Sequence, residues 1–139
     1  MSNPDASLAL KKAIIAKLKV GSAIAGGRNY DRPTASPTFP YTSLGPFDVL
    51  TEIADEYAGG DTTIQIDGWS RGSGSVVASV EIMQIGAAIH GALHEQSLTL
   101  EGDQRLVDLT VESVRYTADS DWLTEHAIVT VRARTEPTA

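Results

Sequence analysis

The fold is decided by three consecutive segments. They read TTIQIDGWS (residues 62–70), RGSGS (71–75) and VVASVEIMQIGAAIHGALH (76–94). In the first segment Ile64 and Ile66 alternate with polar residues, which predicts a half-buried strand with Trp69 on its polar face. The last segment repeats apolar residues at helical spacing and predicts a helix. A strand followed by a helix that is apolar nearly all round indicates a sheet with a helix on one face.

The predicted helix has two apolar stripes. They consist of Ile82, Ile85, Ile89 and Leu93 on one side, and Val76, Val80, Met83 and Ala87 on another. One stripe can cover the chain's own sheet. The second needs another helix or another subunit, so we expect Val76, Val80 and Met83 to make contacts beyond the sheet.

Three strands are predicted after this helix, over residues 98–100, 106–117 and 124–134. In the second of them the apolar positions change parity after Val111, which predicts a β-bulge near Glu112 and Ser113. In the third, every other residue from Ala127 to Ala133 is apolar, as in a half-buried strand. Residues 118–123 are expected to join the last two strands as a hairpin loop.

The N-terminal part predicts a helix that starts at Pro4 and ends at Gly21. Leu10, Ile14 and Leu18 recur at intervals of four, so we expect them to form its buried stripe.

Between the two helices the sequence predicts short extended segments at residues 28–31 and 41–44. Residues 46–61 are expected to form a long acidic loop, with Gly59 and Gly60 as stop signals. A loop of this length is uncommon without a function.

The element order α-β-β-β-α-β-β-β predicts an α+β fold, in which a mixed, mainly antiparallel sheet carries two helices on one face. The 139 residues fit a single domain, 1–139, and we expect its tail to fray from about residue 135.

Composition excludes several function classes. The chain has 11 basic and 18 acidic residues, which give a formal net charge of −7. This charge disfavours nonspecific binding to nucleic acids and binding to anionic membranes. It has no cysteine, which excludes a disulfide scaffold and a thiolate metal site. Its apolar runs are far shorter than the ~20 residues of a membrane span, and its polar start is unlike a signal peptide.

Residues 68–72, GWSRG, match the G-x-S-x-G turn that carries the nucleophile of α/β hydrolases. Asp119 or Asp121 and then His126 follow in hydrolase order. That fold, however, needs a mostly parallel sheet with crossover helices, whereas hairpins surround this segment. We therefore interpret Ser70 as part of a strand end and expect no catalytic residue.

His90 and His94 lie four residues apart and could share a metal, with Glu95 or His126 as a third ligand. The glutamate of an H-E-x-x-H motif is missing, because Gly91 follows His90. We expect a histidine pair at the end of an apolar stripe, with neither a metal nor a cofactor.

Four aromatic residues are expected outside the core of a single chain. They are Phe47 and Tyr57 in the long loop, Trp69 on the polar face of its strand, and Trp122 in the hairpin loop. Aromatic side chains are enriched in the cores of protein interfaces, so this distribution favours an assembly protein. The residues expected at interfaces with subunits or partners are Phe47, Leu50, Tyr57, Trp69, Arg71, Val76, Val80, Met83 and Trp122.

Several segments in this order resemble the tail terminator, or tail-completion, proteins of long-tailed phages and gene transfer agents, over nearly the whole chain. They are GRNYD (27–31), PYTSLGP (40–46), WSR (69–71), ALH (92–94), LTL (98–100), the pair Val111-Glu112 with Arg115, and Glu125-His126.

The resemblance implies a single terminator-like domain that forms a ring, typically a hexamer, at the head-proximal end of the tail. Such a ring caps the tail tube, ends tube polymerisation and joins the tail to the head-side connector. It implies a virion protein assembled in the host cytoplasm, a lumen that DNA passes without specific binding, and no membrane, cofactor or catalysis. The alternatives are a different connector protein, namely a stopper, and a small serine hydrolase that uses Ser70.

Overall fold

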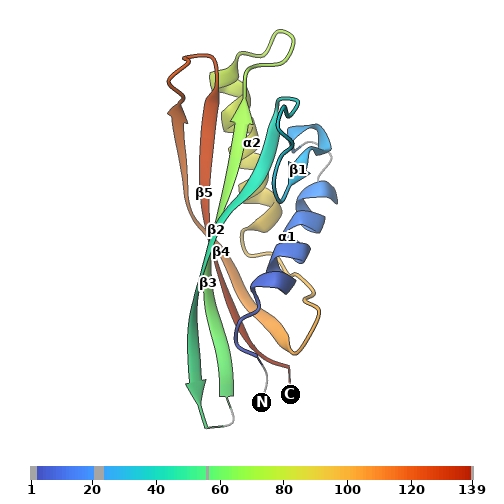
Figure 1. Cartoon of the computed structure of the whole chain (residues 1–139), viewed down its shortest axis with the longest axis vertical. Helices are drawn as coiled ribbons and strands as arrows, with labels where there is room; N and C mark the ends of the chain where they lie inside the picture. Colours follow the sequence, from blue (N-terminus) through green and yellow to red (C-terminus); the bar gives the residue numbers. More distant parts are fainter. Residues whose placement is uncertain (1–2, 21–23, 56, 139) are drawn as a thin grey trace.

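The computed structural model describes residues 3–20, 24–55 and 57–138. They form two α-helices, a short 3-10 turn and one five-stranded sheet (Figure 1). In chain order the elements are α1 (Ser7–Val20), η1 (Ala25–Gly27), β1 (Asn29–Tyr30), β2 (Tyr41–Ala54), β3 (Tyr57–Ser70), α2 (Ala78–Leu93), β4 (Gln104–Ala118) and β5 (Glu125–Pro137).

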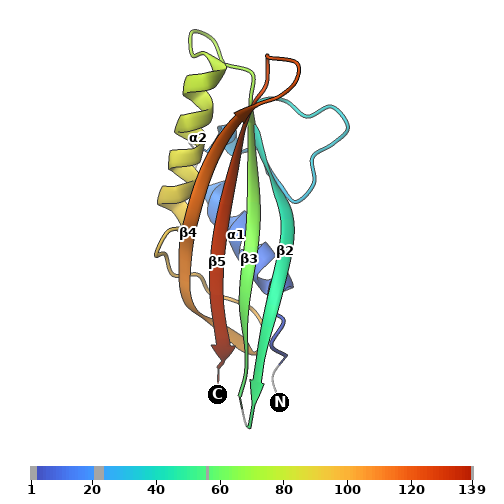
Figure 2. The ribbon, with the colours of Figure 1, turned by 90° about the vertical axis from the view of Figure 1, so that its left-hand side faces the viewer.

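The fold is the predicted α+β arrangement of a mixed, mainly antiparallel sheet with helices on one face. The strand order is β1-β2-β3-β5-β4, and only the short pairing of β1 with β2 is parallel. Helix α2 packs against β3, β4 and β5, and α1 packs against α2 and β1. Figure 1 shows both helices on the same side of the sheet, and Figure 2 looks onto the opposite side, which we call the open face.

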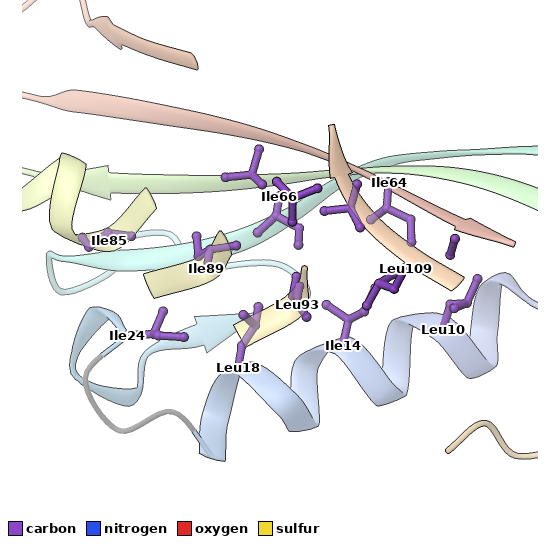
Figure 3. Close-up of a cluster of buried hydrophobic side chains, with 14 of the residues drawn as sticks. Leu10, Ile14, Leu18, Ile24, Ile64, Ile66, Ile85, Ile89, Leu93 and Leu109 are labelled. Carbon is purple, nitrogen blue, oxygen red and sulfur yellow. The ribbon is translucent and has the colours of Figure 1, made fainter. Parts of the chain in front are cut away.

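The core lies between the helices and the sheet (Figure 3). The predicted stripe of α1, Leu10, Ile14 and Leu18, is fully buried there. The other large members are Ile24, Ile64, Ile66, Ile85, Ile89, Leu93, Leu109, Val111, Val129 and Val131. The apolar residues at helical spacing in the helices and those at alternate positions in the strands therefore meet in one core layer.

Helix α1 begins three residues later than the sequence predicts. The Asp5 carboxylate accepts a hydrogen bond from the Ser7 N–H at 3.0 Å, and the Ala6 carbonyl accepts one from the Leu10 N–H at 2.9 Å. Asp5 thus satisfies a free N–H at the helix start, and Pro4 lies outside the helix. The predicted end at Gly21 lies outside the described residues.

The long loop predicted over residues 46–61 is wrong. This stretch forms most of β2 and the start of β3, paired from Phe47 opposite Ile64 to Ala54 opposite Tyr57. A register shift between Leu44 and Phe47 takes up Gly45 and Pro46 as a bulge. A proline is tolerated at such a bulge, so the strand continues through it.

Gly59 and Gly60 are buried residues of β3 and not stop signals. A Cβ atom on Gly60 would lie 2.4 Å from the carbonyl oxygen of Pro4. The N-terminal segment crosses the hairpin at this point, and only a residue without a side chain allows so close an approach.

Two further boundary predictions are wrong. Residues 98–100 form no strand; Leu98 and Leu100 pack against the core from an irregular segment. The chain is also not frayed from residue 135, because β5 runs to Pro137 and Thr135 is buried.

The predicted bulge in β4 is confirmed by a register shift between Val111 and Ser113. A second shift, between Leu106 and Asp108, turns Val107 outward, although simple alternation puts it in the core. Two bulges on an outer strand increase its twist and disfavour pairing with another edge.

Candidate interaction surfaces

The Ser70 hydroxyl belongs to a structural contact. Ser70 is completely buried on the helix side of the sheet, where its Oγ donates to Glu81 Oε1 at 2.7 Å and accepts from the Gly72 N–H at 3.0 Å. His126 stacks on Trp69, on the open face. Serine and histidine are thus on opposite sides of β3 and β5, and the geometry does not support the hydrolase alternative.

The histidine pair on α2 is occupied by other contacts. The rings of His90 and His94 stack with 4.6 Å between their centroids, and His94 Nδ1 accepts the Val111 N–H at 3.0 Å. Within the described ranges no group of three potential ligands is close enough to hold a metal ion.

Trp69 lies on the open face, as the alternation predicts, in a stack of aromatic rings. Its ring is 3.7 Å from that of His126 and nearly parallel to it, and 6.2 Å from that of Tyr41 on the other side. His126 Nε2 also lies 2.8 Å from Asp67 Oδ1. Burial raises the pKa of the Tyr41 hydroxyl, more than nearby Arg71 lowers it. Trp69 is therefore half-buried by its own chain, which limits the surface it offers to a partner.

The rest of the open face is polar and ion-paired. Arg132 Nε donates to Asp61 Oδ1 at 2.8 Å, and this bond holds the pKa of Asp61 below its usual value. Arg134 Nη1 also forms an ion pair with Asp108 Oδ2, at 3.3 Å. Leu50, opposite Asp61 at the hairpin end of this face, is 73% exposed. Elsewhere the open face presents mainly polar and charged side chains, so its centre lacks the composition of an interface core.

The loop between β4 and β5 exposes an aromatic side chain in a strained conformation. Trp122 is 84% exposed and has a φ of 59°, a left-handed value that costs a non-glycine residue energy. Leu123 beside it is also largely exposed. We call Trp122 and Leu123 the loop knob.

The loop knob rests on a well-bonded base. The Asp121 carboxylate accepts the N–H groups of Leu123 and Thr124, each at 2.9 Å, and these bonds lower its pKa. Arg71 Nε donates to Thr124 Oγ1 at 2.9 Å, and its guanidinium lies 4.3 Å from the centroid of the Phe39 ring. Arg71 is thus tied to the loop, although half of its side chain remains in solvent.

The second apolar stripe of α2 is uncovered in the single chain. Val80 and Met83 are 49% and 55% exposed, Val77 is also exposed, and Val76 is half-buried. The first stripe, which includes Ile82 and Leu93, is buried against the sheet and α1. We call Val77, Val80 and Met83 the outer stripe of α2.

The β2–β3 hairpin exposes Leu50, at 73%, and Ile53. Its strands continue beyond the last pair of β3 with β5, Gly60 opposite Thr135, so the tip is a two-stranded ribbon. The other two residues expected here contact their own chain: Phe47 packs against the core with Lys11 Nζ 5.7 Å from its ring centroid, and Tyr57 is half-buried.

The structure thus separates the nine expected interface residues into three regions. Five lie around the loop knob and α2: Arg71, Val76, Val80, Met83 and Trp122. Three lie on the β2–β3 hairpin: Phe47, Leu50 and Tyr57. Trp69 lies within the aromatic stack. Sequence reasoning missed Leu123, Val77 and Val20, which are all exposed. Val20 and Val77 stand next to predicted core stripes and carry no sequence signal of exposure. Leu123 lies beside Trp122 in the predicted hairpin loop, and that position was the signal that could have identified it.

Residues 12–136 match the model of a protein family described as tail completion protein gp17. In a solved structure described as the virion of a native gene transfer agent particle, one chain is 26% identical to this chain and superimposes with a TM-score of 0.79. The match covers 95% of this chain and 98% of that chain. No protein with curated function matches the sequence. No helix among the described residues is long and apolar enough to cross a membrane.

Proposed function

Because this chain belongs to the tail completion protein gp17 family, we propose that it forms a ring that caps the head-proximal end of a tail tube. Family membership and likeness to a virion subunit identify a structural tail protein and not an enzyme, as the sequence predicted. In the proposed role the ring ends tube polymerisation and joins the tail to the head-side connector.

The observation that carries this proposal is the loop knob. A tryptophan with a φ of 59° costs about 1–2 kcal/mol in backbone strain, and an 84% exposed ring recovers little of that cost within one chain. Strain of this kind at an exposed aromatic residue favours a docking role, because tryptophan is among the residues that dominate binding energy.

The loop knob has apolar neighbours at the same end of the molecule. Figure 1 shows the β4–β5 loop and the N-terminal end of α2 together at the top, opposite both chain termini. Val77 and Val80 of the outer stripe lie on that part of α2. This end supplies a wide apolar surface, and we assign it to the contact along the tail axis, with the tube protein or the connector.

In this mechanism the ring caps the tube by docking reversibly onto its last ring. A ring bound to the last tube ring covers the surface on which the next tube subunits would assemble, and presents a different surface to the connector. Several weak contacts, one per subunit, act together and hold the ring firmly. The net charge of −7 is compatible with a lumen that repels DNA during its passage.

The test replaces Trp122 with glycine and measures tail length by electron microscopy in a complementation strain. We expect Trp122→Gly to be at least as stable as the wild type, because glycine tolerates the positive φ. We also expect it to give tails of uneven length without heads. Glu95→Gly is the matched control, since Glu95 is exposed with a φ of 56° but lies away from the loop knob.

Uniform tails joined to heads in the Trp122→Gly strain would show that the loop knob does not carry the contact. Gold labelling locates the protein in the same preparations. A label found only among connector proteins, with no contact to the tube, would identify a stopper in place of a terminator.

A further inference from the structure

Charge is strongly segregated between two elements of this chain. Residues 7–20, which form α1, contain four lysines and no acidic residue. Residues 48–61, which include the hairpin tip, contain five acidic residues and no basic one. In a protein of net charge −7, the hairpin is thus a concentrated acidic segment and α1 is a basic one.

Part of this charge has no partner in the single chain. In the described parts of the chain, Asp48, Glu52 and Asp55 form no ion pair, and neither do Lys17 and Lys19. All three acidic residues are exposed, as is Lys19. An unpaired acidic segment and an unpaired basic segment on one molecule are complementary surfaces for two copies of that molecule.

The same two elements also expose matching apolar side chains. On the hairpin these are Leu50, which shares a face with Asp48 and Glu52, and Ile53 on the opposite face. On α1 they are Leu8 and Val20, the latter 82% exposed, at the two ends of a solvent-facing row. The helix is about 20 Å long and the acidic strand segment from residue 48 to 55 about 24 Å. One can therefore lie along the other over its whole length.

A single chain cannot make this contact with itself. Figures 1 and 2 show the hairpin tip at one extreme of the molecule and the C-terminal half of α1 well away from it. Lys17 and Lys19 belong to that distant half. The partner for the hairpin must therefore come from a second molecule.

We propose that the acidic hairpin of one subunit binds along α1 of a second copy of this chain, as the lateral contact of the ring. This inference rests on the proposed capping function, since it states how the subunits of that ring meet. The contact joins two different surfaces, so it can repeat from subunit to subunit, which is what a ring requires when the rotation between subunits closes. Leu50 adds an apolar contact between the ion pairs of Asp48 and Glu52.

Cysteine cross-linking gives a direct test, because the natural chain has no cysteine that would react. Glu52→Cys is combined with Ala16→Cys, at the middle of the exposed row of α1, and purified protein and assembled particles are treated with a short bismaleimide. We expect a ladder of linked chains up to a closed ring. The control combines Ala16→Cys with Ser113→Cys, an exposed position on the outer strand β4 at the other edge of the sheet, and is expected to give no ladder.

Charge reversal provides the second arm. We expect the pair Lys17→Glu and Lys19→Glu to reduce the ladder about tenfold, because facing like charges are strongly unfavourable across an interface. Adding Asp48→Lys and Asp55→Lys, with the cross-linking cysteine kept at residue 52, should restore it. Recovery in the combined variant also shows that the reversed chains fold.

The inference is wrong if capped tails form normally while the hairpin–α1 pair gives no more ladder than the control. It is equally wrong if reversing the lysines leaves the ladder unchanged. An intact ladder from a protein that does not cap tails would contradict the proposed function and leave the lateral contact standing.

Discussion

At the scale of single residues, the two tryptophans have opposite relations to their own chain. Trp69 is held between His126 and Tyr41, whereas Trp122 is 84% exposed. Stacked aromatic pairs contribute about 0.5–1.5 kcal/mol each beyond the area that they bury. Trp69 therefore stabilises the sheet through its contacts on the open face, and Trp122 has no such role.

We predict that Trp69→Ala lowers the free energy of unfolding by about 2–3 kcal/mol, through lost stacking and lost burial. Trp122→Ala should change it by less than about 0.5 kcal/mol, as exposed substitutions usually do. Urea unfolding of both variants measures the difference. Equal effects would mean that the stack does not stabilise the sheet.

The Asp121 carboxylate makes the base of the loop knob sensitive to acid. Its folded-state pKa is lowered by the N–H groups of Leu123 and Thr124 and by the Thr124 hydroxyl. A lowered pKa means that the contribution to stability is complete above the unfolded value, ~3.9, and is lost as the pH falls through the folded value.

We therefore predict that the wild type melts at a higher temperature than Asp121→Ala between pH 5 and 7, and that this gap narrows as the pH falls below about 4. Thermal unfolding followed by circular dichroism over that pH range is the measurement. A gap that stays constant down to pH 2 would show that the carboxylate bonds do not hold the loop.

At the scale of elements, the sequence predicts well where its pattern matches the burial. The period of two identifies β3 and β5, the four-residue spacing identifies α1, and a change of parity locates the bulge at Glu112. The β2–β3 hairpin escapes prediction because Leu50, Ile53 and Tyr57 also fit helical spacing. Residues 50–55 of this hairpin are all exposed, and its buried positions on β3 include Gly59 and Gly60, so neither strand shows an apolar alternation here.

The interface residues are predictable only in part, for a related reason. An aromatic residue out of place in a pattern indicates a special environment, but not which one. Trp69 and Trp122 gave the same signal, and the structure gives one an intramolecular stack and the other solvent. The distinction depends on Tyr41 and His126, which reach Trp69 only through strand pairing across the sheet.

Helix α2 offers a matched pair of glycines. A Cβ on Gly86 would lie 2.1 Å from the Tyr116 hydroxyl oxygen and 2.8 Å from Cζ of its ring, whereas one on Gly91 would meet nothing within 4 Å. The gain in helix propensity on changing glycine to alanine, about 1 kcal/mol, is the same at both sites.

We predict that Gly91→Ala stabilises the protein by about 0.5–1 kcal/mol. Gly86→Ala should destabilise it by about 1–3 kcal/mol, because the helix must move away from β4 or the ring must shift. Chemical denaturation of the two variants tests the close packing of α2 on the sheet. Similar stabilisation by both substitutions would mean that Gly86 and the Tyr116 ring are less closely packed than in this structure.

At the scale of the whole molecule, the two chain ends are joined to the same end of the sheet. Thr135 pairs with Gly60 on one side and Leu106 on the other, and the Thr138 N–H donates to the Asp103 carbonyl at 3.0 Å. Figure 1 shows both termini close together, near the hairpin.

We predict that removing residues 135–139 lowers the free energy of unfolding by about 2–4 kcal/mol, since each lost backbone hydrogen bond contributes roughly 1 kcal/mol. Removing only residues 138–139 should cost less than about 1 kcal/mol. Thermal melts of the two truncated chains compare them. A harmless five-residue deletion would restore the expectation of a frayed tail.

The pairing of β3 with β5 also governs how fast the molecule can reach its native state. The registers from Gly60 with Thr135 to Ser70 with Glu125 join residues more than fifty positions apart. The β2–β3 and β4–β5 hairpins can each close locally, but the sheet is complete only when the C-terminal hairpin has been synthesised and has found the first one. Such non-local pairing slows folding towards milliseconds to seconds. Until then β3 presents an unpaired edge, and a newly made chain is most prone to aggregation during that interval.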